Sequence, residues 1–355
     1  MEFSIFALPT YFQEQDPPQG DYLRRLIDLL ASVEELGYDG IWANEHHFHP
    51  YGGMIPSPAV LLAALIQRTK RVRLGTSVVV LPLHHPIEVA EQLAMVDLMS
   101  DGRLELGVGR GFVPYDYQNL GVSFEEGQER TQESLEIILA AWSQPTFSYT
   151  GKHYRFDNIE LWPRPQQRPH PPVWIACTGT PSSFTSTGAK GYNLLTVSSL
   201  RPMEKLGELA RLYRDAWNAS GRDPGGYRYA THFQVVVDDD RDRARRIASD
   251  AIRNYFGLHA KALALHPASA NRGFDPLEGF SIERWIDEGR ILAGTPDDVV
   301  ATLRRAQAEL GITGIDGTFF FGGVSFEVAE RSLRLFAEGV IPRMRSATPA
   351  TAAVG

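Results

Sequence analysis

The sequence of 355 residues contains a single cysteine, Cys177, which excludes an internal disulfide framework and a metal site built from several cysteines. Acidic residues outnumber basic ones, 43 against 35, and the formal net charge of -8 does not suit a nucleic-acid-binding protein. No apolar run approaches the ~20 residues that a membrane-spanning helix needs. The amino-terminal stretch has no basic region ahead of an apolar segment, as a signal peptide would have. These absences favour a soluble, cytoplasmic globular protein that binds neither nucleic acid nor membrane.

Short apolar runs alternate with amphipathic helical patterns along the whole chain. Strands are predicted at residues 2–8, 40–43, 72–81, 103–108, 173–176, 193–196, 230–237 and 317–321. Such regular alternation predicts an α/β fold with a parallel sheet. About eight strand–helix units in this length favour a (β/α)8 TIM barrel with insertions, and an open doubly wound sheet is the alternative. No Gly-x-Gly-x-x-Gly follows the first strand, so the dinucleotide-binding pattern gives the open sheet no support.

Three segments depart from this alternation. Residues 144–166 are interpreted as an inserted hairpin before the fifth strand. Residues 257–289 combine glycine and proline with scattered apolar residues, so neither a strand nor one long helix fits them, and connections of this length are commonly lids. The terminal residues 346–355 are interpreted as a disordered tail. The expected organisation is therefore one barrel domain over residues 1–345, with a lid-like segment at 257–289.

The residues that follow each strand are the candidates for chemistry, because active sites of (β/α)8 barrels lie at the carboxyl ends of the strands. Glu45-His46-His47-Phe48-His49 follows the second strand. Three histidines in four residues resemble a metal site, but no nearby acidic residue or histidine pair completes a ligand set, so no metal is predicted. An imidazole at a strand end suits proton transfer or hydrogen bonding to a charged ligand. Surface histidines without a functional role are the alternative.

Two further strand ends carry features of anion-binding sites. Gly-Val-Gly-Arg-Gly at 107–111 combines glycines that permit close approach with Arg110, which can bind a phosphate through two hydrogen bonds. Thr-Gly-Thr-Pro-Ser-Ser at 178–183 leads into a helix, where hydroxyls and free backbone N–H groups can bind an anion. An ordinary strand-to-helix turn and an ordinary helix cap are the respective alternatives.

Together these stretches resemble the family of bacterial luciferase-like, flavin-dependent monooxygenases. The resemblance is carried by EHHF at 45–48 and by VVLPLHHPIEVAEQLAMVDLMSDGRLELGVGRG at 79–111. It continues at Asp116, Tyr117 and Gly121. It implies a (β/α)8 barrel that binds FMN at the carboxyl ends of its strands and that often forms a dimer.

The resemblance also implies roles for individual residues. His46 is similar in position to the active-site histidine beside the flavin ring. Ser77 and Val78 match a dipeptide beneath the isoalloxazine ring that is often joined by a cis peptide bond. The residues that match contacts of the flavin phosphate, or their backbone neighbours, are Arg110, Thr178, Gly179, Thr180 and Ser183.

Three positions separate the chain from particular members of the superfamily. Gly109 stands where luciferase has a reactive cysteine, and Gly179 stands where an acidic residue precedes the phosphate-binding serine. Both differences argue against light emission and leave flavin binding intact. Deazaflavin-dependent relatives typically have Asp-His where this chain has Glu45-His46, so FMN is the preferred cofactor.

The resulting hypothesis is a two-component monooxygenase in which a separate reductase supplies reduced FMN, and O2 oxygenates a small organic substrate. Aromatic residues near the strand ends suggest that this substrate is apolar. A deazaflavin-dependent oxidoreductase that transfers hydride and a noncatalytic flavin-binding protein are the alternatives. A homodimer is expected through the helices that begin near Ser57 and His85, because both carry long apolar stretches.

Overall fold

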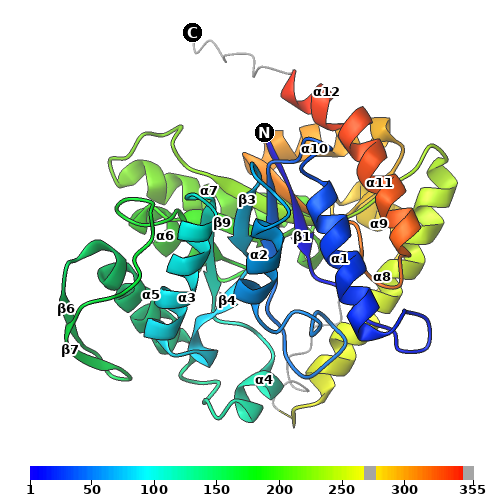
Figure 1. The fold of residues 1–355 in the computed structure, drawn as a ribbon. Coiled ribbons are helices and arrows are strands. Elements are labelled where there is room, and N and C mark those ends of the chain that lie inside the picture. The colour runs from blue at the N-terminus through cyan, green and yellow to red at the C-terminus, as the bar shows by residue number, and fades with distance from the viewer. Residues whose placement is uncertain (268–276, 347–355) are drawn as a thin grey trace, which may run out of the picture.

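Eight parallel strands close into a barrel in the computed structural model, which describes residues 1–267 and 277–346 (Figure 1). β1 pairs with β2 on one side and β12 on the other, and the pairing of β9 with β10 completes the ring. In chain order the barrel strands are β1 (Glu2–Ala7), β2 (Gly40–Ala43), β3 (Arg73–Thr76), β5 (Leu104–Gly109), β8 (Val173–Ala176), β9 (Asn193–Val197), β10 (Tyr229–Val237) and β12 (Gly314–Thr318). The predicted (β/α)8 barrel is confirmed, and the open sheet is excluded.

Helices surround the barrel and connect consecutive strands (Figure 1). The longer ones are α1 (Gln19–Ser32), α2 (Pro58–Ile66), α3 (Pro86–Met99), α5 (Gly127–Ser143), α6 (Pro181–Lys190), α7 (Met203–Ala219), α8 (Arg241–Ala264), α10 (Pro296–Leu310) and α11 (Phe326–Gly339). Short helices are α4 (Pro114–Asn119), α9 (Ile282–Asp287) and α12 (Ile341–Arg345), with 3-10 turns η1 (Leu81–Leu83) and η2 (Ser198–Leu200). Across the described residues, no helix combines the length and apolar character needed to cross a membrane.

Local sequence signals set several helix ends. Pro58 and Pro86 each lie in a first helical turn, where the missing N–H would have no intrahelical partner. Thr295 and Asp298 form a reciprocal capping box at the start of α10, and Gly311 ends that helix with a φ of 71°. α2 and α3 therefore begin where the sequence predicts them.

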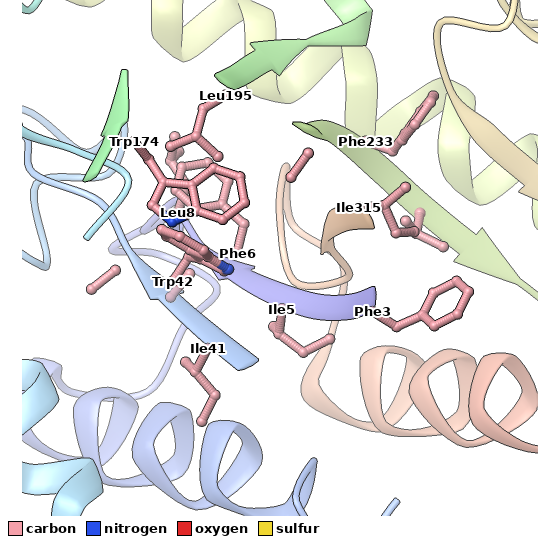
Figure 2. Packing of buried hydrophobic residues seen from close by; sticks show 14 of the residues in the cluster. Phe3, Ile5, Phe6, Leu8, Ile41, Trp42, Trp174, Leu195, Phe233 and Ile315 are labelled. Atoms are coloured by element: carbon pink, nitrogen blue, oxygen red, sulfur yellow. The ribbon is translucent and has the colours of Figure 1, made fainter. Parts of the chain in front are cut away.

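Large aromatic side chains fill the barrel interior. The rings of Trp42 and Trp174 meet edge to face with centroids 5.2 Å apart, and Figure 2 shows Phe6 beside them. Any Cβ at Gly75 would overlap the Trp42 ring, so a glycine is needed at this point of β3. On the outer side of the strands, Phe3 packs against Phe336 of α11. The interior is thus a packed core that closes the barrel beneath its carboxyl end.

The structure corrects two predicted strands and adds a third that was not predicted. The strand expected at 72–81 is divided into β3 and β4 (Val79–Val80), with the Ser77–Val78 peptide bond between them. The final barrel strand lies at Gly314–Thr318, three residues before the predicted start, because its register is set by pairing with β1 and β10. The sequence analysis missed β11 (Leu292–Gly294), which pairs with the end of β10.

The structure confirms the prediction for one inserted segment and corrects the prediction for the other. Within 144–166, β6 (Phe147–Thr150) and β7 (Arg155–Ile159) form an antiparallel hairpin, as the sequence predicts. The expectation that no long helix enters 257–289 is wrong, because α8 continues to Ala264. Further on, α9 packs against α8, and Phe280 contacts the Trp285 ring at 5.1 Å between centroids. Residues 268–276 of the expected lid and residues 347–355 of the expected tail lie outside the described residues.

Candidate active site

The loops that carry the predicted site residues emerge from one end of the barrel. His46 follows β2, Ser77 and Val78 lie between β3 and β4, Arg110 follows β5, and Thr178 follows β8. Because these strands are parallel, their carboxyl ends share the same rim. In Figure 1 this is the end at which α4 lies, opposite the amino terminus. The barrel therefore brings together side chains that are more than a hundred residues apart in sequence.

His46 lies in a buried aromatic pocket, with only 8% of its surface exposed. Its ring centroid is 5.0 Å from that of Tyr51 and 5.6 Å from those of His49 and Phe112. Burial, followed by the repulsion of His49 and His259, lowers the pKa of His46 well below its ordinary value. His46 is consequently neutral at pH 7 and has a nitrogen lone pair that can accept a proton.

A glycine next to this pocket makes room for the histidine. Gly52 has a φ of 73°, and a Cβ there would lie 2.6 Å from Cδ2 of His46. The Gly52 carbonyl also accepts a hydrogen bond from the Asn44 side-chain amide at 3.2 Å. The loop after β2 therefore folds back against His46 only because residue 52 has no side chain.

Glu45 anchors the loop that carries His46. Its buried carboxylate accepts hydrogen bonds from His47 Nε2 at 2.9 Å, from His84 Nε2 at 2.6 Å and from the Val80 N–H at 2.9 Å. Burial opposes ionisation, but the hydrogen bonds from His47 and His84 outweigh it and lower the pKa of Glu45. Burial of His84 is likewise outweighed by Glu45, which raises the pKa of that imidazole. His47 and His84 thus support the loop, and the neighbouring His46 faces the pocket.

Three more polar side chains, each from a different element, lie together at the same pocket. His49 comes from the loop after β2, Asp116 from α4 and His259 from α8. Nε2 of His49 lies 3.5 Å from Oδ1 of Asp116. Within the described structure, both ring nitrogens of His49, Oδ1 of Asp116 and Nδ1 of His259 are buried without a hydrogen-bond partner. Burial also lowers the pKa of His259 to about 4.

Sequence reasoning missed this polar group. Asp116 is too far from the histidine run in sequence to be recognised as completing it, although it was noted as part of the family resemblance. His259 lies in the segment that was expected to lack a long helix. Its spacing from Tyr255 and Ile252, both buried on α8, was the signal that could have extended that helix.

Arg110, which follows β5, is held by contacts with Phe124, three residues before α5 begins. Its guanidinium carbon lies 4.2 Å from the centroid of the Phe124 ring, and Nη2 donates to the Phe124 carbonyl at 3.1 Å. The Tyr117 hydroxyl donates to the Arg110 carbonyl. Among the described atoms, Nε of Arg110 is buried and has no hydrogen-bond partner. The side chain is therefore fixed in place with donor capacity left over for an anion.

The start of α6 carries hydroxyl groups close to an arginine side chain. Thr180 is its N-cap residue and forms no side-chain capping bond in the described structure. Pro181 has no N–H, and the Ser183 N–H donates to the Thr180 carbonyl at 3.0 Å, so the Thr180 and Ser183 hydroxyls are the groups left to bind an anion. Arg201, from the turn after β9, donates to the Thr178 carbonyl at 3.1 Å. Any Cβ at Gly179 would overlap the Arg201 guanidinium. Gly179 thus permits a cation beside Thr180 and Ser183 that the sequence analysis did not identify.

The glycines at the end of β5 serve the barrel wall. In the sequence analysis, these glycines were interpreted as permitting the close approach of a ligand. In the structure, a Cβ at Gly107 would overlap the Thr76 carbonyl oxygen. A Cβ at Gly109 would lie 2.8 Å from Cγ2 of Val78. The Ser77–Val78 bond itself is cis, as the family resemblance implies. Gly109, which stands where luciferase has cysteine, therefore makes space for Val78.

The barrel and its rim of ionisable side chains place the chain among enzymes built on the (β/α)8 fold. More narrowly, the chain belongs to the luciferase-like monooxygenase family, whose family model matches residues 1–314. An uncharacterized Sinorhizobium fredii protein, y4vJ, is 31% identical over 226 residues, a match that covers 63% of each chain. The 4-hydroxyprotoasukamycin monooxygenase of Streptomyces nodosus subsp. asukaensis is 28% identical over 97% of this chain and 92% of its own.

Solved structures agree with this assignment. Monooxygenase RslO1 from Streptomyces bottropensis superposes with a TM-score of 0.89 at 31% identity, covering 97% of this chain and all of its own. The fold alone is shared with two more distant structures, each 20% identical. One is the oxygenating constituent of 3,6-diketocamphane monooxygenase from Pseudomonas putida in complex with FMN, with a TM-score of 0.80 and coverage of 97% and 98%. The other is an F420-dependent secondary alcohol dehydrogenase, with a TM-score of 0.72 and coverage of 96% and 98%.

The family assignment makes this protein a flavin-dependent monooxygenase of the luciferase-like class. A further relative, from Acinetobacter baylyi, is named the oxygenase component of a flavin-dependent trigonelline monooxygenase. It is 32% identical over 196 residues, or 55% of this chain and 53% of its own.

Proposed function

We propose that the protein is the oxygenase of a two-component system that uses FMN, reduced by a separate reductase, and O2 to oxygenate a small apolar organic substrate. The observation that carries this proposal is the buried, neutral His46, which lies on the same barrel rim as Arg110, Arg201 and the start of α6. The FMN complex of the Pseudomonas putida protein supports the choice of cofactor. The named oxygenase component from Acinetobacter baylyi supports a separate reductase.

The residues at the rim fit a flavin that carries a phosphate. Thr180 and Ser183 offer hydroxyls at the start of α6, and Arg201 and Arg110 offer positive charge. The dipole of α6 adds to this preference for an anion at its amino end. The family resemblance assigns the ring system to Ser77 and Val78, which are half-buried between β3 and β4. When bound, reduced flavin supplies the electrons that activate O2.

His46 would hold or accept a proton during the reaction. A neutral imidazole next to the reacting atoms can act as a general base, whereas a protonated one cannot. The rings of Tyr51 and Phe112 pack around it and exclude water. Outside this pocket, Phe48 is 55% exposed and contacts the Tyr115 ring, which provides an apolar surface for a substrate. Glu45, through His47 and His84, keeps the loop in position.

Two alternatives remain to be separated by experiment. Hydride transfer with a deazaflavin is a candidate because the F420-dependent dehydrogenase shares this fold, and Glu45 in place of aspartate favours FMN through the family resemblance. A noncatalytic flavin-binding protein would have no use for a buried, neutral histidine at the rim. The cytoplasmic location stays a prediction.

The test is anaerobic titration of the purified protein with reduced FMN, oxidised FMN and reduced deazaflavin, followed by admission of O2. The proposal expects the tightest binding for reduced FMN and stoichiometric O2 consumption by the complex. Tight binding of deazaflavin with no O2 consumption would favour hydride transfer. Tight FMN binding with O2 consumption no faster than that of free flavin would favour the noncatalytic alternative.

The proposal includes a homodimer formed through α2 and α3. These two helices pack side by side and expose Val60, Met95, Leu98 and Met99. Val60 is 69% exposed and Met95 49%, although α2 and α3 carry many buried apolar residues on their inner faces. A second copy of the same surface would remove these side chains from water.

A further inference from the structure

We propose that His46, His49 and Asp116 form a binding site for a divalent transition-metal ion of the Zn2+ type. The sequence analysis predicted no metal here because no ligand near the histidine run completed a set. The structure supplies the third ligand from α4, about seventy residues further along the chain.

The positions of the donor atoms carry the proposal. One ligand atom from each of the three residues lies within 4.8 Å of the other two, and all three residues are buried. In a tetrahedral site with bonds of roughly 2.1 Å, neighbouring ligand atoms are about 3.4 Å apart. His49 Nε2 and Asp116 Oδ1, at 3.5 Å, already have this separation. Small side-chain rotations of His46 would complete the set.

A second observation points to an occupant for this group. His49 has a side chain that is 3% exposed, yet neither of its ring nitrogens has a hydrogen-bond partner among the described residues. The facing Oδ1 of Asp116, 3.5 Å from His49 Nε2, is also buried and makes no hydrogen bond to any described residue. Buried polar atoms are nearly always satisfied, so unpartnered atoms aimed at one point indicate that something else binds there.

A neighbouring cluster provides an internal comparison. Glu45, His47 and His84 also place their ligand atoms within 4.8 Å of one another. In that cluster, however, the carboxylate accepts hydrogen bonds from both imidazoles and from a backbone N–H. A metal ion would have to break those bonds first. The two clusters have the same kinds of ligand, and only the one with unsatisfied atoms is suited to an ion.

The ligand set selects the type of metal. Two imidazoles and one carboxylate with an open fourth position are typical of zinc sites that keep a water ligand, and the same set suits other divalent transition ions. Mg2+ and Ca2+ prefer oxygen ligands and are disfavoured by two imidazoles. Binding would occupy a nitrogen of His46, so the ion should inhibit the oxygenation. This consequence rests on the proposed function, whereas metal binding itself does not.

The experiment uses untagged, metal-free protein titrated with Co2+ as a spectroscopic probe and with Zn2+ in a calorimeter. Wild-type protein should bind one Co2+ with the intense visible absorption of low-coordinate cobalt, and one equivalent of Zn2+ should remove that absorption. His49→Ala and Asp116→Asn should each weaken binding at least about 100-fold, since loss of a ligand exceeds the loss of an outer-sphere partner. His153→Ala, on the turn of the β6–β7 hairpin, is the matched control and should retain the single site. Circular dichroism verifies that each variant is folded.

The outcomes separate the metal site from the proposed function. No binding by folded wild-type protein, or undiminished binding in both His49→Ala and Asp116→Asn, overturns the site. Binding that survives both ligand variants and disappears in His153→Ala would assign the ion to the surface pair of His153 with Glu129 and also overturns it. One bound Zn2+ with undiminished O2-coupled turnover supports the site and contradicts the role of His46. Absence of turnover in metal-free protein concerns the proposed function alone.

Discussion

Oε1 of Glu45 lies 2.6 Å from Nε2 of His84, which joins the residue next to His46 to the chain that follows β4. Each partner favours the charged form of the other in the folded protein: the pKa of Glu45 is lowered and the pKa of His84 is raised. Because Glu45 is next to His46, the orientation of the loop that carries His46 depends on the protonation of Glu45 and His84.

Loss of this ion pair should give a pH-dependent loss of stability. The folded pKa of Glu45 lies below its ordinary 4.5, so its contribution is present above that pH and is lost as pH falls through the folded value. The folded pKa of His84 lies above 6.5, so its contribution is complete below that pH and is lost as pH rises through the folded value. Glu45→Gln should therefore lower the free energy of unfolding most between about pH 4.5 and 6.5, by roughly 3 kcal/mol. Urea denaturation across pH 4 to 9 measures this, and a loss that is uniform in pH would contradict it.

His46 should serve turnover more than folding. His46→Ala is expected to reduce O2-coupled oxygenation by about 100-fold or more, the range for loss of a general acid or base, with little change in the melting temperature. Steady-state turnover with enzymatically reduced FMN and a thermal melt give the two readouts. Wild-type turnover in a folded variant would refute the role, and a large fall in melting temperature would point to a structural one.

The phosphate of FMN should be recognised by Arg110 and Arg201. Alanine at either position should weaken FMN binding by about 10- to 100-fold, as expected for loss of a charge-assisted hydrogen bond. Riboflavin, which lacks the phosphate, should lose much less affinity. Arg24→Ala is the control, since its ion pair with Asp21 lies on the exposed face of α1. Equal losses for FMN and riboflavin would remove both residues from the phosphate site.

The dimer prediction concerns the exposed apolar side chains of α2 and α3. Sedimentation should show a species of about twice 39.5 kDa at micromolar concentration. Met95→Glu combined with Met99→Glu should convert it to monomer, because two charges would be buried without partners at the interface. Leu212→Glu, at an exposed apolar residue of α7, is the matched control and should leave the dimer intact. A monomeric wild-type protein would rule the interface out.

Gly107 should be among the most sensitive glycines of the barrel. A methyl group there would overlap the Thr76 carbonyl oxygen across two barrel strands, so Gly107→Ala should lower the free energy of unfolding by about 1–3 kcal/mol or more. Gly257→Ala is the contrasting control: its Cβ would have no neighbour within 4 Å, and alanine should stabilise the interior of α8 by up to about 1 kcal/mol. Chemical denaturation of the two variants compares them directly, and similar effects would contradict the prediction.

The alternation of strands and helices was readable from the sequence because it depends on local patterns. Apolar runs of strand length, prolines in first turns and glycines after last turns are properties of short windows, and they predicted the barrel with most of its helix starts. The long run at 79–111 likewise identified the family before any contact was known. Arg110, Thr180 and Ser183 were predicted to contact the flavin phosphate in the same way, from residue types at strand ends and at a helix start, and that role stays a prediction.

Tertiary structure alone decided which of these side chains meet. Asp116 reaches His49 across the barrel rim, His259 joins them from a helix whose end the sequence analysis misjudged, and Arg201 lies over Gly179 from the following strand. It also decided that His46 is buried and neutral while its neighbour Glu45 is ionised by His47 and His84. The physical reason is that closure of parallel strands into a ring brings distant segments to one rim, where burial and pairing, which no local pattern encodes, set the charge of each group.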